Sequence, residues 1–91
     1  MKIELADQVH EFIRSRSPES RRWLRDGLRK LAEEKGDIKP LLNELDGYYR
    51  LRVKSYRIIF RYVSRSGKRT ILCDFAEGRD VVYEAFLSLL D

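Results

Sequence analysis

The spacing of hydrophobic residues changes along this 91-residue chain, and the changes mark where strands and helices should begin. Residues 2–5 alternate between polar and apolar side chains, which predicts a short β-strand. Across residues 6–16 the apolar side chains Val9, Phe12 and Ile13 recur at helical spacing, which predicts a first helix with one buried side.

A second helix has clear signals at both ends. Ser17 is suited to cap its N-terminus, and Pro18 is suited to its first position, where the missing N–H costs nothing. The sequence Lys35-Gly36 is typical of a helix C-terminus followed by a left-handed glycine. We expect the buried stripe of this helix to consist of Leu24, Leu28 and Leu31, with Trp23 beside it.

The second half of the chain alternates at the period of β-strands. After a connector at 37–46, residues 48–54 and 56–62 predict two strands joined by a tight turn. Residues 70–76 are apolar on both alternations, which favours a strand inside the sheet, with Ile71, Cys73 and Phe75 on one side. Residues 80–90 predict a last helix, capped by Asp80, with Val82, Phe86 and Leu89 facing inward.

This order of elements predicts the fold class. One strand, two helices, three strands with short connections and a final helix indicate a single small α+β domain over residues 1–91. Short connections between successive strands favour a mostly antiparallel, four-stranded sheet. We expect an N-terminal helical hairpin, a C-terminal helix, and helices covering one face of the sheet.

The alternation within the two central strands also predicts how they pair. A turn centred between Lys54 and Ser55 places Arg52 directly opposite Arg57. The same register pairs Arg50 with Ile59, Tyr48 with Arg61, Leu51 with Ile58 and Tyr49 with Phe60. One face is then apolar and aromatic, and the other carries Tyr48, Arg50, Arg52, Lys54, Arg57 and Arg61 with no acidic residue of the hairpin among them.

Charge is concentrated in this part of the chain. Residues 47–73 hold eight of the 19 basic residues and none of the 15 acidic ones, although the formal net charge of the whole chain is only +4. Like charges opposite each other destabilise a sheet by up to about 1 kcal/mol, so the Arg52–Arg57 pair calls for an explanation. A bound phosphate or nucleic acid explains it, and arginine suits phosphate because its planar fork donates two parallel hydrogen bonds. Two alternatives remain: an acidic protein segment as ligand, or a plain solvated surface.

A second basic surface lies on the outer side of the second helix, where Arg21, Arg22, Arg25 and Arg29 recur. It fits a solvated helix face, and it also fits contact with nucleic acid or a partner protein.

Composition narrows the chemistry. The hairpin contains no carboxylate, and neither a phosphate-binding glycine loop nor a metal-ligand motif is present, so we expect no metal and no cofactor. Any cleavage of RNA would then use the 2′-hydroxyl of the RNA as nucleophile, with cations stabilising the transition state. No apolar run is long enough to span a membrane, and the single cysteine, Cys73, reads as an unreactive buried thiol in a reducing cytosol. We therefore expect a cytoplasmic protein without membrane contact.

Three segments resemble one known superfamily. Leu45–Val53, Tyr56–Phe60 and Glu77–Tyr83 are similar to the Leu-x-Gly-x-Tyr-Arg-Leu-Arg, Tyr-Arg-Ile and Asp-Val-Tyr patterns of the RelE/ParE toxins of type II toxin–antitoxin systems. The layout of predicted elements also fits that superfamily over nearly the whole chain. The resemblance implies a RelE-like toxin that cleaves mRNA on the ribosome without a metal, leaving a 2′,3′-cyclic phosphate or a 3′-phosphate.

The resemblance also implies roles for individual residues. Arg57 corresponds to the arginine that stabilises the transition state, Arg50 and Arg52 to basic strand residues used in RNA binding and acid–base chemistry, and Tyr83 to the C-terminal tyrosine that stacks on or activates the substrate. Arg79 corresponds to one of the arginines before that tyrosine, and Lys54 supplements the set. The sequence departs from the pattern at Gly78, where relatives often carry a second basic residue, and at positions 50 and 52, where they often carry lysine. Arginine stays protonated and is a poorer base.

By the same resemblance, the partners would be a cognate antitoxin, in a toxin–antitoxin hetero-oligomer, and the ribosome with its mRNA. RNA contact would involve Tyr48, Lys54 and Arg61 of the hairpin and the arginines of the second helix. Two other functions stay open: inhibition of DNA gyrase, as in the ParE branch, and a non-toxic relative that only binds its antitoxin. The joint presence of Arg57, Arg79 and Tyr83 favours the RelE branch.

Overall fold

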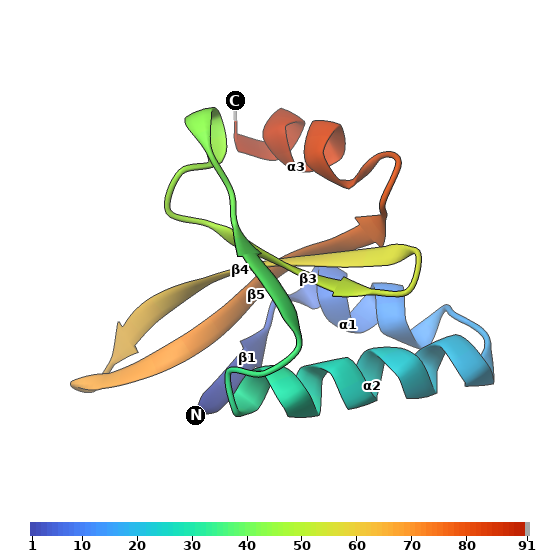
Figure 1. Ribbon diagram of the computed structural model, residues 1–91, viewed down its shortest axis with the longest axis horizontal. Helices are drawn as coiled ribbons and strands as arrows, with labels where there is room; N and C mark the ends of the chain where they lie inside the picture. Colours follow the sequence, from blue (N-terminus) through green and yellow to red (C-terminus); the bar gives the residue numbers. More distant parts are fainter. Residues whose placement is uncertain (91) are drawn as a thin grey trace.

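The computed structural model describes residues 1–90 and consists of a five-stranded sheet with helices packed on both of its faces (Figure 1). In chain order the elements are β1 (Lys2–Leu5), α1 (Asp7–Arg14), α2 (Pro18–Ala32), β2 (Asp37–Pro40), the 3-10 turn η1 (Asn43–Leu45), β3 (Tyr49–Val53), β4 (Tyr56–Arg65), β5 (Lys68–Gly78) and α3 (Val82–Leu90). Across the sheet the order is β1-β5-β4-β3-β2; β1 runs parallel to β5 and the other neighbours are antiparallel. The predicted α+β class and mostly antiparallel sheet are confirmed.

The predicted number of strands was one too low. The connector at 37–46 contains β2, which pairs with β3 along the edge of the sheet. This strand is short, mostly exposed and ends in Pro40, features that protect an edge strand from further pairing. Because they also weaken the alternation by which strands are recognised, the sequence pattern did not reveal it.

The prediction that helices cover only one face was also wrong. Helices α1 and α2 pack on the face that carries Leu51, Ile58 and Phe60, where the larger cluster of buried residues lies. Helix α3 packs on the opposite face, over Ile59 and Phe75. In Figure 1 the sheet therefore separates α3 from α2. The cause is visible in the sequence: Ile59 is an apolar residue among the basic ones on its face, and it gives α3 a place to pack.

A β-bulge in β5 moves two side chains from the predicted side of the sheet to the other. Ile59 pairs with Phe75 and Phe60 pairs with Cys73, so Asp74 is the extra residue between them. Phe75 consequently joins the small core beneath α3, while Ala76 joins the main core with Cys73. Strict alternation would have kept Phe75 beside Cys73.

The ends of the helices agree in part with the prediction. The Ser17 hydroxyl caps α2 by accepting a hydrogen bond from the backbone N–H of Ser20 at 3.2 Å, with Pro18 at the first position as expected. The helix ends at Ala32 rather than at Lys35, and Glu34 takes a left-handed conformation before Gly36 does. In α3 the inward-facing residues are Val82 and Phe86, whereas Leu89, which we expected to face inward, is 66% exposed.

No helix within residues 1–90 is both long enough and apolar enough to cross a lipid bilayer.

Candidate functional site

The central hairpin has the predicted register. Arg52 lies opposite Arg57, Arg50 opposite Ile59, Leu51 opposite Ile58 and Tyr49 opposite Phe60. Of the two turn residues only Lys54 has a positive φ, at 56°, so the turn is not type I′, in which both would be positive. The two arginines therefore face each other on the side of the sheet that α3 covers only in part.

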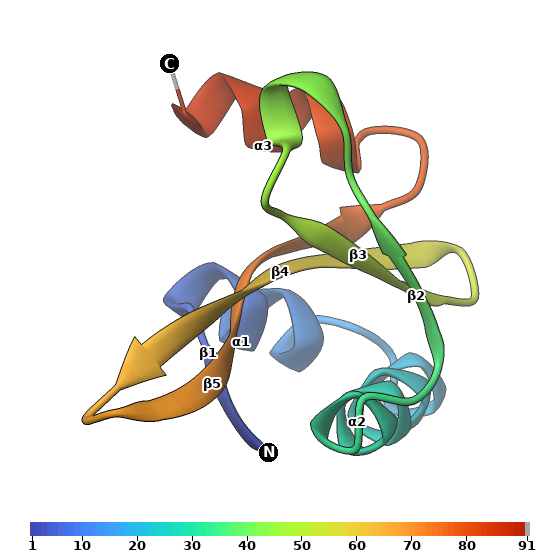
Figure 2. The same ribbon diagram turned by 60° about the vertical axis from the view of Figure 1, so that its left-hand side comes forward.

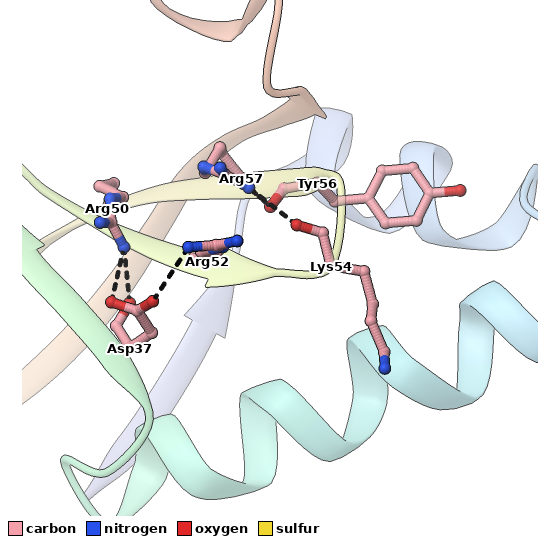
Figure 3. A network of polar contacts seen from close by, with 6 residues as sticks. All are labelled: Asp37, Arg50, Arg52, Lys54, Tyr56 and Arg57. Atoms are coloured by element: carbon pink, nitrogen blue, oxygen red, sulfur yellow. Dashed lines mark hydrogen bonds and ion pairs between the residues drawn. The ribbon is translucent and has the colours of Figure 1, made fainter.

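The guanidinium of Arg57 folds back onto the turn between β3 and β4. Its Nη1 donates to the carbonyl oxygens of Lys54 at 3.0 Å and Tyr56 at 2.9 Å (Figure 3). Arg79 reaches the same end of the sheet, because its backbone N–H donates to the carbonyl of Ser55 at 2.8 Å. Its side chain is 59% exposed and lies 3.7 Å from Asp80. The structure thus brings Arg52, Arg57 and Arg79 together around the β3–β4 turn.

The basic face does have an acidic neighbour, contrary to what the hairpin sequence alone suggested. Asp37 of β2 lies directly opposite Arg52, and its Oδ1 accepts a hydrogen bond from Arg50 Nη1 at 3.0 Å (Figure 3). The same Arg50 nitrogen donates to the Asp37 backbone carbonyl at 2.9 Å, and Arg52 Nη1 lies 3.9 Å from Asp37 Oδ2. The hydrogen bond from Arg50 lowers the pKa of Asp37, so the carboxylate is charged at neutral pH. Because the Arg50 side chain is only 12% exposed and is paired with Asp37, its guanidinium is largely shielded from any ligand in solution.

Lys54 does not belong to the basic face, although alternation placed it there. Its side chain points toward α2 (Figure 3). Its Nζ lies 5.1 Å from the centre of the Trp23 ring. This is a cation–π contact with the helix that covers the opposite face. The left-handed backbone of Lys54 ends the alternation at this residue and explains the change of direction.

Tyr48 and Arg61 lie beneath and beside α3. The Tyr48 ring packs edge-to-face on Phe86, with 5.1 Å between ring centres. The Arg61 guanidinium lies 5.9 Å from the centre of the Tyr48 ring. Arg61 Nε donates to Asp74 Oδ2 at 3.1 Å, and this hydrogen bond raises the pKa of Arg61. Tyr48 is therefore engaged in packing and Arg61 is paired with the bulge carboxylate.

Tyr83 occupies the first turn of α3 and is half-buried against the small core beneath that helix. The two residues that precede Arg79 point in different directions. Glu77 lies opposite Arg57 and shares its face, while its Oε1 accepts from the Gly78 backbone N–H at 3.0 Å. Gly78 lies opposite Tyr56, which packs against the main core. Strand alternation therefore directs position 78 away from Arg57.

The arginines of α2 form a separate surface on the other side of the sheet. Arg21 Nη1 donates to the Arg16 carbonyl at 2.8 Å, and Arg29 pairs with Asp26 at 3.0 Å. Arg21 and Arg25 line a groove of about 710 Å³ between α1 and α2. Arg22 is exposed on the same helix. The structure therefore does not bring Arg21, Arg22, Arg25 and Arg29 together with the hairpin arginines.

Two further expectations concern thiol and metal chemistry. Cys73 is fully buried, and burial raises the pKa of its thiol to about 12, so it stays protonated at neutral pH. Within residues 1–90 no three His, Cys, Asp or Glu side chains are grouped so that they could hold a metal ion.

Two relevant residues, Asp37 and Glu77, were missed in the sequence. Asp37 is 13 positions from Arg50 and reaches it only through β2, so no local pattern indicated the contact. Glu77 lies opposite Arg57 only because of the bulge in β5, since extending the register of Arg65 with Lys68 without it would place Ala76 there; no local pattern therefore indicated this contact either.

The arrangement as a whole is the fold of the RelE/ParE class of toxins. A YoeB/ParE toxin from Agrobacterium tumefaciens superposes with a TM-score of 0.67, at 16% sequence identity over 86% of this chain and 98% of that one. RelE in a RelB–RelE antitoxin–toxin complex from Methanococcus jannaschii gives a TM-score of 0.63, at 20% identity over 90% and 96% of the two chains. The toxin–antitoxin complex RelBE2 from Mycobacterium tuberculosis gives 0.61, at 18% identity over 86% and 96%. No protein-family model and no curated protein matches the sequence.

Proposed function

We propose that this protein is the toxin of a type II toxin–antitoxin module in the RelE/ParE superfamily, and that it cleaves mRNA on the ribosome without a metal ion. The main support is the Arg52–Arg57 pair, which faces outward beside Arg79 in a fold shared with such toxins. A phosphate group between these guanidinium groups would accept hydrogen bonds from both, and it would add to the partial charge compensation that Asp37 and Glu77, opposite the two arginines, already give.

The chemistry would be transfer of the phosphoryl group within the RNA. The 2′-oxygen forms a bond to the adjacent phosphorus, the bond to the 5′-oxygen of the next nucleotide breaks, and a 2′,3′-cyclic phosphate and a 5′-hydroxyl result. One proton leaves the 2′-hydroxyl and one reaches the 5′-oxygen. Arg57 and Arg52 would stabilise the charge that develops on the phosphorane oxygens, and such donors contribute most when they are positioned in advance.

Tyr83 is the candidate for stacking on the substrate or for proton transfer, because the arginines stay protonated and cannot accept a proton. Arg50 would support the site through Asp37 rather than touch the phosphate, since its guanidinium is held by that residue.

The expected partners follow from the same proposal. An antitoxin segment with acidic side chains would cover the basic face, in a hetero-oligomer; the two relatives solved as antitoxin–toxin complexes support this. Ribosomal RNA would contact the arginines of α2 as well as the hairpin. The protein would act in the cytoplasm, where its mRNA target is translated.

A gyrase inhibitor of the ParE kind is the second candidate. It is favoured by the observation that Arg50, Arg61 and Lys54 already contact Asp37, Asp74 and Trp23, which leaves a smaller set of available cations than a nuclease built from the whole hairpin would have. A non-toxic relative that only binds an antitoxin would fit the same observation.

The deciding experiment is to induce the protein in bacteria and map the 5′ ends of mRNA. A nuclease gives cuts in phase with codons, and Arg57→Ala should lower their frequency about 100-fold or more, the usual cost of removing one donor to a transition state. Arg14→Ala is the matched control, because Arg14 is exposed on α1 and pairs with Glu11. DNA breaks with intact mRNA would indicate gyrase, and unaffected growth would indicate the non-toxic relative. Either result would refute the nuclease proposal.

A further inference from the structure

We propose that the tip of the β4–β5 hairpin, together with β1, forms a second RNA-binding surface. It would bind the sugar–phosphate backbone away from the candidate site at Arg52, Arg57 and Arg79. The inference rests on the proposed function in taking RNA as the ligand. Its residues are Lys2, Arg65 and Lys68, with Arg69 at the border.

The first observation is a second pair of facing cations. Arg65 lies directly opposite Lys68 at the end of the hairpin, next to the turn at Ser66 and Gly67. Both turn residues have positive φ, 53° and 78°, as a tight type I′ turn requires, so the pairing of the two cations is firmly set. Like charges in this position destabilise the hairpin unless an anion or water separates them.

The second observation is a hollow beside this pair. About 610 Å³ of open space is bordered by Lys2, Arg65, Ser66, Lys68, Arg69 and Thr70. Lys2 reaches it because β1 runs beside β5, with Lys2 next to Thr70. Cations from three strands therefore surround one concave surface. The hairpin tip projects beyond the rest of the sheet (Figure 2), so a large ligand can approach without touching the helices.

The third observation is the charge balance. Among residues 1–90 the ion pair at this surface is that of Arg65 with Glu4, at 3.1 Å. Lys2 and Lys68 form no ion pair within those residues, and the Arg69 guanidinium lies 4.1 Å from the centre of the Tyr62 ring. The surface thus keeps a clear positive excess, in contrast to the candidate site, where Asp37 and Glu77 lie beside the arginines.

The position of this surface favours RNA over a short acidic peptide. Arg57, Arg61 and Arg65 point to the same side of β4, since they are separated by even numbers of residues. Eight residues of strand place Arg65 about 26 Å from Arg57, beyond the small core that α3 covers. A long polyanion can contact both ends of the strand, whereas a segment that only neutralises the candidate site has no need of the hairpin tip. Edge protection of β1 would explain Lys2, but it would not explain two cations facing each other in the interior pair β4–β5.

The test measures binding to a labelled RNA stem–loop with 2′-O-methyl riboses, which cannot be cut, across a series of NaCl concentrations. Lys2→Ala/Lys68→Ala is the principal variant, because it leaves the Arg65–Glu4 pair intact, and Arg65→Ala/Lys68→Ala is the second. The control Lys30→Ala/Lys35→Ala removes the same charge from the end of α2. Thermal unfolding verifies that each variant is folded.

The slope of log affinity against log salt is negative, and we expect its magnitude to decrease by about 1.5 in both variants of this surface, since each phosphate contact contributes about 0.7 to 0.9. In the control the slope should stay unchanged. Equal slopes for patch and control variants would overturn the inference. So would a patch variant that binds RNA normally but no longer binds polyglutamate, because the ligand would then be an acidic protein. As the probe is never cut, this binding result is independent of the mRNA mapping, and either proposal can fail while the other stands.

Discussion

Among single residues, Asp37 determines how many of the cations on the basic face can meet a ligand. Its carboxylate holds Arg50 through a hydrogen bond and lies near Arg52, so both cations already have an anionic neighbour. The Asp37 carboxylate is solvated, so water and salt screen the contact and a polyanion can compete with it. Asp37 therefore both orients Arg50 and lowers the attraction of the face for anions.

Replacing Asp37 with asparagine should strengthen binding of the uncut RNA probe at low salt. The substitution removes one negative charge but keeps an acceptor for Arg50, and we expect affinity to rise by up to about fivefold. Glu33→Gln is the matched control, since Glu33 pairs with Lys35 after the end of α2 at 3.7 Å, away from the α2 arginines proposed to contact RNA. Fluorescence anisotropy measures both. Weaker binding by Asp37→Asn would mean that Asp37 serves mainly to position Arg50.

The residues themselves show where prediction from sequence stops. The Arg52–Arg57 register was predictable because two alternations and one turn agree on it. The contact between Asp37 and Arg50 was not, because it depends on an edge strand without a recognisable pattern. Lys54 was assigned to the wrong side because alternation does not continue through a left-handed turn residue. Sequence reasoning thus identified which cations are present, but not which ones neighbouring residues engage.

At the level of elements, the approach of α2 to β3 depends on one glycine. A Cβ at Gly27 would lie 2.7 Å from Val53 Cγ2, closer than carbon atoms can pack. Val53 is buried and branched at Cβ, so it has little freedom to move aside. Gly27 therefore allows the helix to lie close against the strand that carries Arg52 and positions that strand relative to the helix.

Gly27→Ala should destabilise the protein even though alanine is the better helix former. The helix would gain about 0.5 to 1 kcal/mol, whereas overpacking costs about 1 to 3 kcal/mol, so we expect a net loss of about 1 kcal/mol in the free energy of unfolding. Urea denaturation measures it. In a Val53→Ala background the clash is removed, and the same substitution should become stabilising. A stabilised Gly27→Ala single variant would contradict the close packing.

The order and type of most elements could be read from periodicity and capping residues, as Ser17 and Pro18 of α2 illustrate. The side on which a residue lies was less certain. The bulge at Asp74 adds one residue to β5 and exchanges the faces of Phe75 and Ala76. No local feature of the sequence Cys73-Asp74-Phe75 predicts this bulge. A register that depends on a bulge is fixed by packing on both faces of the sheet, which the sequence of one strand does not contain.

In the molecule as a whole, the sheet separates two cores of unequal size. Among residues 1–90, twelve buried residues form the core beneath α1 and α2, and five form the core beneath α3. The apolar stripe of α3 would look the same whichever face it covered, which is why the sequence left its side undetermined. Since Tyr83 belongs to the smaller core and Arg79 precedes the same helix, part of the candidate site depends on the weaker half of the structure.

Phe86→Ala should release α3 while the rest of the fold persists. Phe86 contacts both Tyr48 and Phe75, and replacing a buried phenylalanine by alanine costs about 3 to 5 kcal/mol, a large share of what so small a core can supply. Because regions with few buried contacts open independently, hydrogen exchange should become fast throughout α3, while amides of β4, β5 and α2 remain protected. Mass spectrometry of exchanged peptides resolves the two regions. Leu89→Ala, at a position 66% exposed, should leave exchange unchanged. If Phe86→Ala instead accelerates exchange equally in α3 and α2, the two cores unfold as one unit, and the candidate site is held by the stability of the whole protein.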